Sequence, residues 1–506
     1  MIAPDAASFA AAYARGEPQV VWTRVVDDLE TPVSAFLKLA QGRPYAFLFE
    51  SVEGGAFRGR YSFLAMRPDL VWRCRGDRAE IADDASLHAF RSEPGGALDS
   101  LRRLVAETRL TLPPELPPMA AGLFGTLGYD MVRLFERLGE ANPDPLGLPD
   151  AVMIRPSVVA VFDGLKQEIV LVTTVRPDAR AAEAAYADAA SRLQGAAADL
   201  RRPLPPRADP QPRPQAAPVS PVSRAAYGEI VERAKAYIAA GDVFQVVPSH
   251  RFSAPFGLPP FAFYRSLRRL NPSPYMFFLD FGDFQLAGSS PEILVRLRDD
   301  RVTIRPIAGT RPRGATPEED RALEAELLAD PKERAEHQML LDLGRNDVGR
   351  AVMLREEGRN RPPEPGRSRV RVTERFTVER YSHVMHIVSN VEGDAPEGLD
   401  PVDVILTALP AGTLSGAPKV RAMQIIDELE SLKRGVAYAG AAGYISAGGD
   451  VDTAIVLRTA LFKDGVMHVQ AGGGVVADSD PDAEYEETLH KSAALRRAAE
   501  EAWRFT

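Results

Sequence analysis

The chain has 506 residues, of which 45% are hydrophobic and 26% are charged, a composition typical of soluble globular proteins. Its net charge of −9 argues against broad nucleic-acid binding, which requires a basic surface, but leaves small anionic ligands open. No apolar run reaches the roughly 20 residues of a membrane helix, and residues 1–16 lack the pattern of a secretory signal. The single cysteine, Cys74, excludes an internal disulfide and fits a cytoplasmic protein without membrane contacts.

Strand-like runs alternate with turns between residues 20 and 175, and an alanine-rich helix is expected at about 179–193. A proline-rich stretch follows at 201–221, where eight of 21 residues are proline and few are large and apolar. Such a stretch cannot build a core, so we predict an extended linker. It separates an N-terminal domain at 1–200 from a second domain at 222–506.

The second domain is expected to begin with a helix capped by Ser223 and ended near Gly241. Further helices should start at Thr316-Pro317, Asp330-Pro331 and Asp480-Pro481. Strands are expected at 244–247, 273–281, 285–294, 302–307 and within 436–471, the last cluster including a hairpin at Asp464-Gly465. Strand clusters and helix pairs without regular βαβ spacing favour an α+β fold with largely antiparallel sheets.

Two pairs of acids stand near the predicted starts of two helices: Glu333 with Glu336, and Glu484 with Glu487. Each pair is spaced by three residues and therefore shares a helix face. Converging pairs are suited to Mg²⁺, which takes one or two carboxylates together with water and substrate oxygens. Alternatively, the acids only complement the helix dipoles.

Gly472, Gly473 and Gly474 form a run whose backbone amides suit an anion, although a tight turn without a ligand is equally compatible. Arg458 lies in the strand-like run 453–462, among small residues. Its guanidinium group either binds a ligand carboxylate or pairs with Asp452, which the alternation of side chains along a strand places on the same face.

Glu292 follows a proline kink and is a candidate general acid, or an ordinary surface carboxylate. His386 stands in an apolar run, where a hydrogen-bonded core histidine is the alternative to a catalytic one. Cys74 has no small-residue elbow or nearby histidine, so we assign it no nucleophilic role.

Four motifs occur in a fixed order, at residues 307–314, 336–347, 412–419 and 472–474. Together they strongly resemble the chorismate-utilising enzyme family, densely from about residue 223 to 498. The resemblance implies a four-layer α/β/β/α fold, in which two orthogonally packed antiparallel sheets lie between helices and both chain halves contribute.

Two positions distinguish the branches of this family. Aminodeoxychorismate synthases commonly carry a lysine where this chain has Ala308. Isochorismate and salicylate synthases place a water-activating lysine where this chain has Gln245. Both positions point to the anthranilate synthase branch, because ammonia, unlike water, needs no such base.

The resemblance also implies a tryptophan feedback site. Residues 48–51 resemble a Leu-Leu-Glu-Ser element, with Phe49 replacing a leucine, and residues 59–63 and 271–276 resemble the other walls. The residues expected to contact tryptophan are Glu50, Ser51, Arg60, Pro274, Tyr275 and Met276.

The remaining roles follow from the same resemblance. Mg²⁺ is expected on Glu336 and Glu487, supported by Glu333 and Glu484. The catalytic candidates are Glu292, His386, Gln245 and Thr413. Substrate contacts are expected from Gly309, Thr310, Tyr438, Arg458, Gly472, Gly473, Gly474 and Lys491.

The chain shows no convincing glutamine amidotransferase half, so ammonia is expected from a separate subunit, in a heterotetramer of two large and two small chains. Two alternatives stay open. One is aminodeoxychorismate synthase component I; the other is a non-catalytic tryptophan-sensing protein on the same scaffold.

Overall fold

The computed structural model describes residues 1–40, 42–51, 59–83, 86–87, 89–204, 213–353, 370–381 and 384–506. The α-helices are α1 (Ala6–Ala14), α2 (Pro32–Leu39), α3 (Ala97–Thr108), α4 (Ala182–Leu200), α5 (Arg224–Ala239), α6 (Pro260–Leu270), α7 (Pro317–Ala329), α8 (Pro331–Met353), α9 (Pro401–Ala408), α10 (Lys419–Leu429) and α11 (Pro481–Glu501).

The strands before the linker are β1 (Ile2–Ala3), β2 (Gln19–Val26), β3 (Ala46–Glu50), β4 (Tyr61–Arg75), β5 (Arg78–Ala82), β6 (Arg91–Ser92), β7 (Gly122–Leu127), β8 (Ala151–Asp163) and β9 (Glu168–Val175). Those after it are β10 (Gln245–Val246), β11 (Ser249–Pro255), β12 (Tyr275–Asp280), β13 (Phe284–Ser290), β14 (Ile293–Arg298), β15 (Arg301–Ile304), β16 (Ile307–Pro312), β17 (Val370–Arg380), β18 (Val384–Asp394), β19 (Gly416–Ala417), β20 (Ala441–Ser446), β21 (Val451–Ile455), β22 (Thr459–Lys463) and β23 (Val466–Gly472).

Several elements begin or end at the residues that the sequence indicates. The side chains of Ser223, Thr316 and Asp480 each cap a helix by accepting a backbone N–H, at α5, α7 and α11. Asp464 and Gly465 both have positive φ, 49° and 73°, as a two-residue hairpin between β22 and β23 requires. The predicted helix and hairpin signals are therefore confirmed.

The sheet confirms the predicted α+β class. The pairings between described strands are antiparallel. Within the described residues they link 21 strands into one continuous sheet, and β10 with β19 forms a separate two-stranded one. The division into two orthogonal sheets in four layers stays a prediction, because the hydrogen-bonded pairing is continuous.

Strands from the two sides of the linker pair directly with one another. β3 pairs with β12, and β7 pairs with β20. One hydrophobic cluster accordingly contains Trp72 beside Val295 and Ile405. The domain division at 201–221 stays a prediction, and the two sides share sheet and core.

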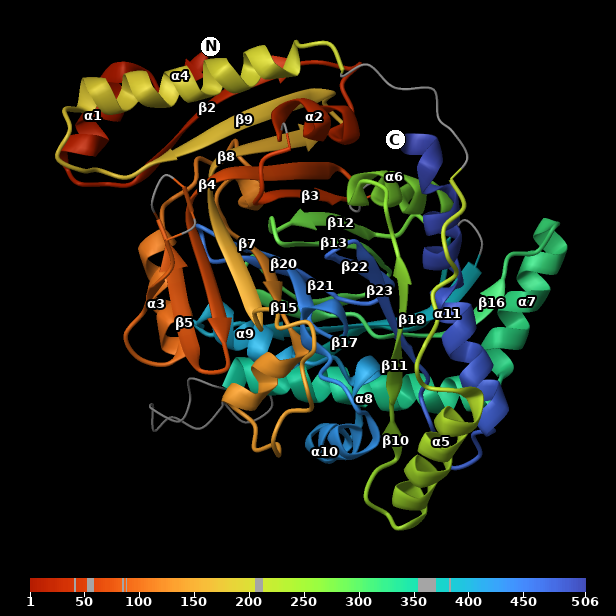
Figure 1. Ribbon diagram of the computed structural model, residues 1–506. Helices are drawn as coiled ribbons and strands as arrows, with labels where there is room; N and C mark the ends of the chain where they lie inside the picture. The colour runs from red at the N-terminus through yellow and green to blue at the C-terminus, as the bar shows by residue number, and fades with distance from the viewer. Residues whose placement is uncertain are drawn as a thin grey trace.

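Helices cover the sheet from outside. Figure 1 shows α1 and α4 over β2 and β9 at the N-terminal end, and α8 and α9 along the opposite side of the strands. α11 packs against β23, α5 and α6. None of the helices in the described ranges combines the length and apolar character needed to cross a bilayer.

Candidate active site and ligand cavity

The first two turns of α8 and of α11 bring the two predicted glutamate pairs toward each other. Burial raises the pKa of Glu336, and the neighbouring carboxylates of Glu333 and Glu487 raise it further. Burial also raises the pKa of Glu484, with Glu487 contributing in the same direction. These mutual effects show that the four carboxylates lie near one another, and their binding of a cation stays a prediction.

These carboxylates fit an Mg²⁺ ion that is bound mainly by water and substrate oxygens and by few protein groups. Glu484 accepts a hydrogen bond from Ser479 Oγ at 2.7 Å, while its Oε2 is buried without a partner. An unpaired buried carboxylate oxygen calls for a cation or donor. No three acidic, histidine or cysteine side chains among the described residues are placed to hold one ion together. Mg²⁺ does not need three, because water and substrate oxygens complete its shell.

The glycine run at residues 472–474 lies against α11. Lys491 ion-pairs with Glu487 at 2.6 Å and donates to the carbonyl of Gly472 at 3.0 Å. A Cβ at position 473 would stand 2.5 Å from Glu484 Oε2, and one at 474 would stand 2.5 Å from Gln245 Nε2. Gly473 and Gly474 therefore allow Glu484 and Gln245 to approach the backbone.

Gln245 joins this group through β10. Its Nε2 lies 3.5 Å from Glu336 Oε1, which is a weak hydrogen bond, and its Oε1 is buried without a partner. Gln245 occupies the position where the resemblance predicts a lysine in isochorismate and salicylate synthases, and its own role stays a prediction.

Glu292 is a buried carboxyl rather than a surface one. Burial raises its pKa to about 8, although Thr413, Arg458 and Lys491 act in the opposite direction. The buried Thr413 hydroxyl lies near Glu292 but outside hydrogen-bonding geometry. Both residues line a small cavity of about 30 Å³ between α8 and residues 411–413, at the start of the 3-10 helix Gly412–Leu414. Glu292 is thus protonated at neutral pH, as a general acid must be.

Arg458 differs in conformation from the expectation. It does not lie in the middle of a strand: β21 ends at Ile455, β22 begins at Thr459, and Arg458 has a φ of 47°. The alternation of small residues across 453–462 resembles a single continuous strand. The chain instead breaks between β21 and β22, where a hydrogen bond from another strand holds it: Arg458 O accepts from Ser289 N at 3.2 Å.

The predicted alternative partner of Arg458 is also wrong. Asp452 accepts from Arg296 at 3.2 Å and pairs with Arg298. Within the described part of the chain Arg458 forms no ion pair, and burial lowers its pKa while Glu292 opposes this. An unpaired, half-buried guanidinium is suited to a ligand carboxylate.

His386 is held as a neutral imidazole. Its Nδ1 lies 2.9 Å from the carbonyl of Gly309 and 3.1 Å from Thr310 Oγ1. A carbonyl only accepts, so Nδ1 carries the proton and Nε2 does not. Burial lowers the pKa of His386, with Arg458 acting in the same direction. Gly309 has a φ of +67°, and a Cβ there would stand 3.1 Å from Glu333 Oε2.

Tyr438 is buried beside the same site, with the Arg434 guanidinium 5.3 Å from its ring centroid. Glu487 raises the pKa of Tyr438, although burial is the larger cause. The structure thus groups the predicted catalytic, substrate and metal residues; their individual roles stay predictions.

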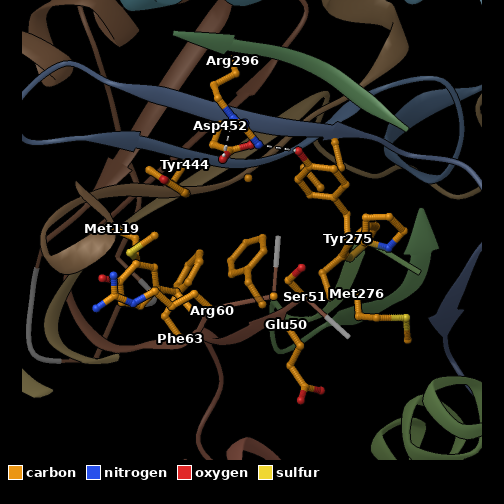
Figure 2. Close-up of a pocket in the computed structure, with 18 of the residues that line it drawn as sticks. Glu50, Ser51, Arg60, Phe63, Met119, Tyr275, Met276, Arg296, Tyr444 and Asp452 are labelled. Carbon is orange, nitrogen blue, oxygen red and sulfur yellow. Dashed lines mark hydrogen bonds and ion pairs between the residues drawn. The ribbon is translucent and has the colours of Figure 1, made fainter. Parts of the chain in front are cut away.

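A second, larger cavity of about 310 Å³ lies between the two halves of the chain (Figure 2). All six residues predicted to contact tryptophan line it. Its other walls include Phe49, Phe63, Met119, Arg296, Arg298, Tyr444 and Asp452. Apolar and aromatic walls with a few polar groups suit an amphipathic ring.

Two of the predicted contacts direct their charges elsewhere. Figure 2 shows the Glu50 carboxylate pointing away from the cavity, where it accepts from Tyr264 at 2.5 Å and Arg268 at 2.9 Å. Arg60 pairs with Asp163 at 2.6 Å. Sequence reasoning missed Arg296, Tyr444 and Asp452, because only the long-range strand pairing brings them here.

Comparisons with known proteins agree with this geometry. Residues 67–497 match the family described as chorismate binding enzyme. The chain is 56% identical to anthranilate synthase component 1 of Cereibacter sphaeroides, over 98% of each chain. It resembles the crystal structure of anthranilate synthase component I from Streptococcus pneumoniae, with a TM-score of 0.74, 36% identity, and 93% and 98% of the two chains covered.

The menaquinone-specific isochorismate synthase of Escherichia coli shares the fold, with a TM-score of 0.68 at 20% identity, over 98% and 100% of the chains. The scaffold therefore serves more than one enzyme. The chain belongs to the chorismate binding enzyme family and, within it, to the anthranilate synthase component 1 branch. The family membership predicted from the four motifs is confirmed.

Proposed function

We propose that the protein is the large component of an anthranilate synthase, which converts chorismate and ammonia to anthranilate, pyruvate and water. This is the first committed step of tryptophan biosynthesis. The observation that carries the proposal is Glu292, a buried acid with a pKa of about 8, beside the unpaired guanidinium of Arg458. One group can protonate a leaving hydroxyl while the other holds a carboxylate.

The substrate is held through its two carboxylates. Arg458, Tyr438 and the amides of residues 472–474 receive the enolpyruvyl carboxylate. Glu336 and Glu487, supported by Glu333 and Glu484, would hold Mg²⁺. When bound, Mg²⁺ offsets the charge of the ring carboxylate and fixes its position. Gly309 and Thr310 contact the ring.

The chemistry needs one acid and no water-activating base. Ammonia forms a bond to C2, the ring electrons shift, and the C4–O bond breaks as Glu292 donates its proton to release water. The ammonium group now bonded to C2 then returns a proton to the Glu292 carboxylate. Loss of the C2 proton next breaks the C3–O bond, so that the ring aromatises to anthranilate and enolpyruvate takes a proton to become pyruvate. His386 and Thr413 line the path of the leaving groups, and Gln245 supplies no lysine amine that would activate water.

Ammonia is supplied by a glutamine amidotransferase subunit, in a heterotetramer of two large and two small chains. L-Tryptophan is the feedback inhibitor and occupies the 310 Å³ cavity, whose apolar walls suit the indole. Main-chain groups of Glu50 and Ser51, with Arg60, Pro274, Tyr275 and Met276, surround it.

The test uses the purified chain with chorismate, Mg²⁺ and ammonium, with and without tryptophan, while anthranilate fluorescence and pyruvate are followed. Formation of both products, suppressed by tryptophan and by chelation of Mg²⁺, is expected. Chorismate consumption without pyruvate would replace the proposal by an aminodeoxychorismate or isochorismate synthase. No consumption by folded protein, with or without an amidotransferase subunit, would favour a non-catalytic protein.

A further inference from the structure

A buried arginine outside the described site touches several of the segments that form it. Arg434 is 2% exposed and precedes the short 3-10 helix Gly435–Ala437, which leads into Tyr438. Its charge is compensated by Glu430, one turn earlier, through bonds from Nε at 3.0 and 3.2 Å and from Nη2. Charges this deeply buried persist only when they are paired and hydrogen-bonded.

The guanidinium also donates to two carbonyls from distant parts of the chain. Nη1 donates to Leu414 O at 2.6 Å, and Nη2 donates to Val247 O at 2.7 Å. Leu414 follows Thr413, and Val247 lies two residues after Gln245. The fork therefore joins two catalytic segments, which also meet through the β10–β19 pairing.

The same group reaches two further parts of the site. Its guanidinium carbon lies 5.3 Å from the ring centroid of Tyr438 and 4.9 Å from that of Tyr129, within cation–π range of both rings. Glu430 accepts from Ser249 N at 2.7 Å and Ser249 Oγ at 2.8 Å. Ser249 is the strand partner of Gly472, the first residue of the glycine run.

We propose that Arg434 is a positioning residue that sets the mutual placement of Gln245, Thr413, Tyr438 and the glycine run. It touches none of the reacting atoms. Planar donors on two different nitrogens hold two carbonyls at a fixed separation, which a single ammonium cannot do. The inference rests on the proposed function, since its readout is chorismate turnover.

The principal variant is Arg434→Lys, which keeps the charge beside Glu430 but loses the fork. We expect a 10- to 100-fold loss in kcat/KM for chorismate, shared between kcat and KM. The matched control is Arg67→Lys, which alters a part-buried ion pair with Asp199 (2.7 Å) between β4 and α4. It should change kcat/KM less than twofold at any comparable loss of melting temperature.

A second pair of variants separates positioning from stability. Arg434→Met strands the buried Glu430 carboxylate and is expected to lower the melting temperature strongly. Arg434→Met/Glu430→Met removes both charges and should recover much of that loss. Under the proposal, kcat/KM stays low in the double variant despite the recovered stability.

Three outcomes are distinguishable. An inactive wild-type chain would refute the proposed function and not the role of Arg434. An active wild type with unchanged kcat/KM in folded Arg434→Lys would overturn the positioning role. Return of kcat/KM together with melting temperature in the double variant would do the same, because Arg434 would then act only on stability.

Discussion

At the scale of single residues, the burial of Glu292 determines the pH range over which this proposed general acid carries its proton. A carboxyl whose pKa is raised to about 8 keeps its proton at neutral pH and loses it above that value. We expect kcat, measured at a constant concentration of free ammonia, to be level below pH 8 and to fall above it. Glu292→Gln should lower kcat by about 100- to 10,000-fold and remove this alkaline limb.

Stability provides the control for this variant. In the unfolded chain Glu292 titrates near 4.5, so between 4.5 and about 8 the folded state binds the extra proton. The free energy of unfolding therefore falls as pH rises through that window. Glu292→Gln should melt higher than wild type at pH 8 and close to it at pH 4. Equal pH profiles of kcat in the two proteins would remove Glu292 as the acid.

Arg458 permits a second prediction at this scale. Its guanidinium is half-buried without an ion pair among the described residues, so truncation leaves no stranded acid. Arg458→Ala should raise the KM for chorismate about 10- to 100-fold, as expected for loss of a charge-assisted bond, without lowering the melting temperature. Unchanged chorismate kinetics would show that Arg458 lies outside the substrate site.

The residue scale also shows where sequence reasoning ends. The glutamate pairs could be picked out by their spacing near helix starts, and Arg458 by its place among small residues, whereas only Glu336 stands in one of the four motifs. The partners of Asp452 and Glu50 could not, because Arg296 and Arg268 are 156 and 218 residues away in the chain. Those contacts depend on which strands and helices pack together, and no local pattern encodes that.

At the scale of elements, the glycine run and the start of α11 are fitted to each other. Position 473 leaves room for Glu484 only because it has no Cβ; an added one would stand 2.5 Å from Oε2. Gly473→Ala should push Glu484 aside and raise the Mg²⁺ concentration needed for half-maximal rate at least severalfold. Titration of activity with Mg²⁺ measures this directly.

The control at this scale is Gly228→Ala on α5. Its Cβ would meet Pro481 at 3.6 Å, an ordinary contact, and Ala favours the helix. It should leave the Mg²⁺ requirement unchanged and the protein as stable or more so. If the two variants behave alike, the glycine run does not set the position of the metal acids.

The elements that carry a clear cap or turn signal could be predicted from local sequence. Caps at Ser223, Thr316 and Asp480 and the Asp464-Gly465 turn depend on neighbours within four residues. The predicted strand across Arg458 fails because bonds from β13 and from residue 439 break it. Period-two alternation describes side-chain faces, and it does not detect a kink imposed by other strands.

At the scale of the whole molecule, the 310 Å³ cavity and the active site share strands. Arg296 and Asp452 line the cavity from β14 and β21. Ile293 at the start of β14 follows Glu292 directly, and Ile455 at the end of β21 donates its N–H to Glu292 O at 3.0 Å. A ligand that shifts these two strands would therefore shift Glu292, the proposed general acid.

This shared framework leads to a prediction about linkage. Tryptophan and chorismate should bind antagonistically, each raising the Kd of the other by the same factor, because the coupling free energy is reciprocal. Calorimetric titrations without ammonia measure both factors without turnover. Ser51→Phe, which fills the cavity, should abolish tryptophan binding and inhibition while changing kcat less than about twofold, since Ser51 touches no catalytic group. Unaltered inhibition in this variant would place tryptophan elsewhere, and binding of both ligands without mutual effect would mean that β14 and β21 do not carry the coupling.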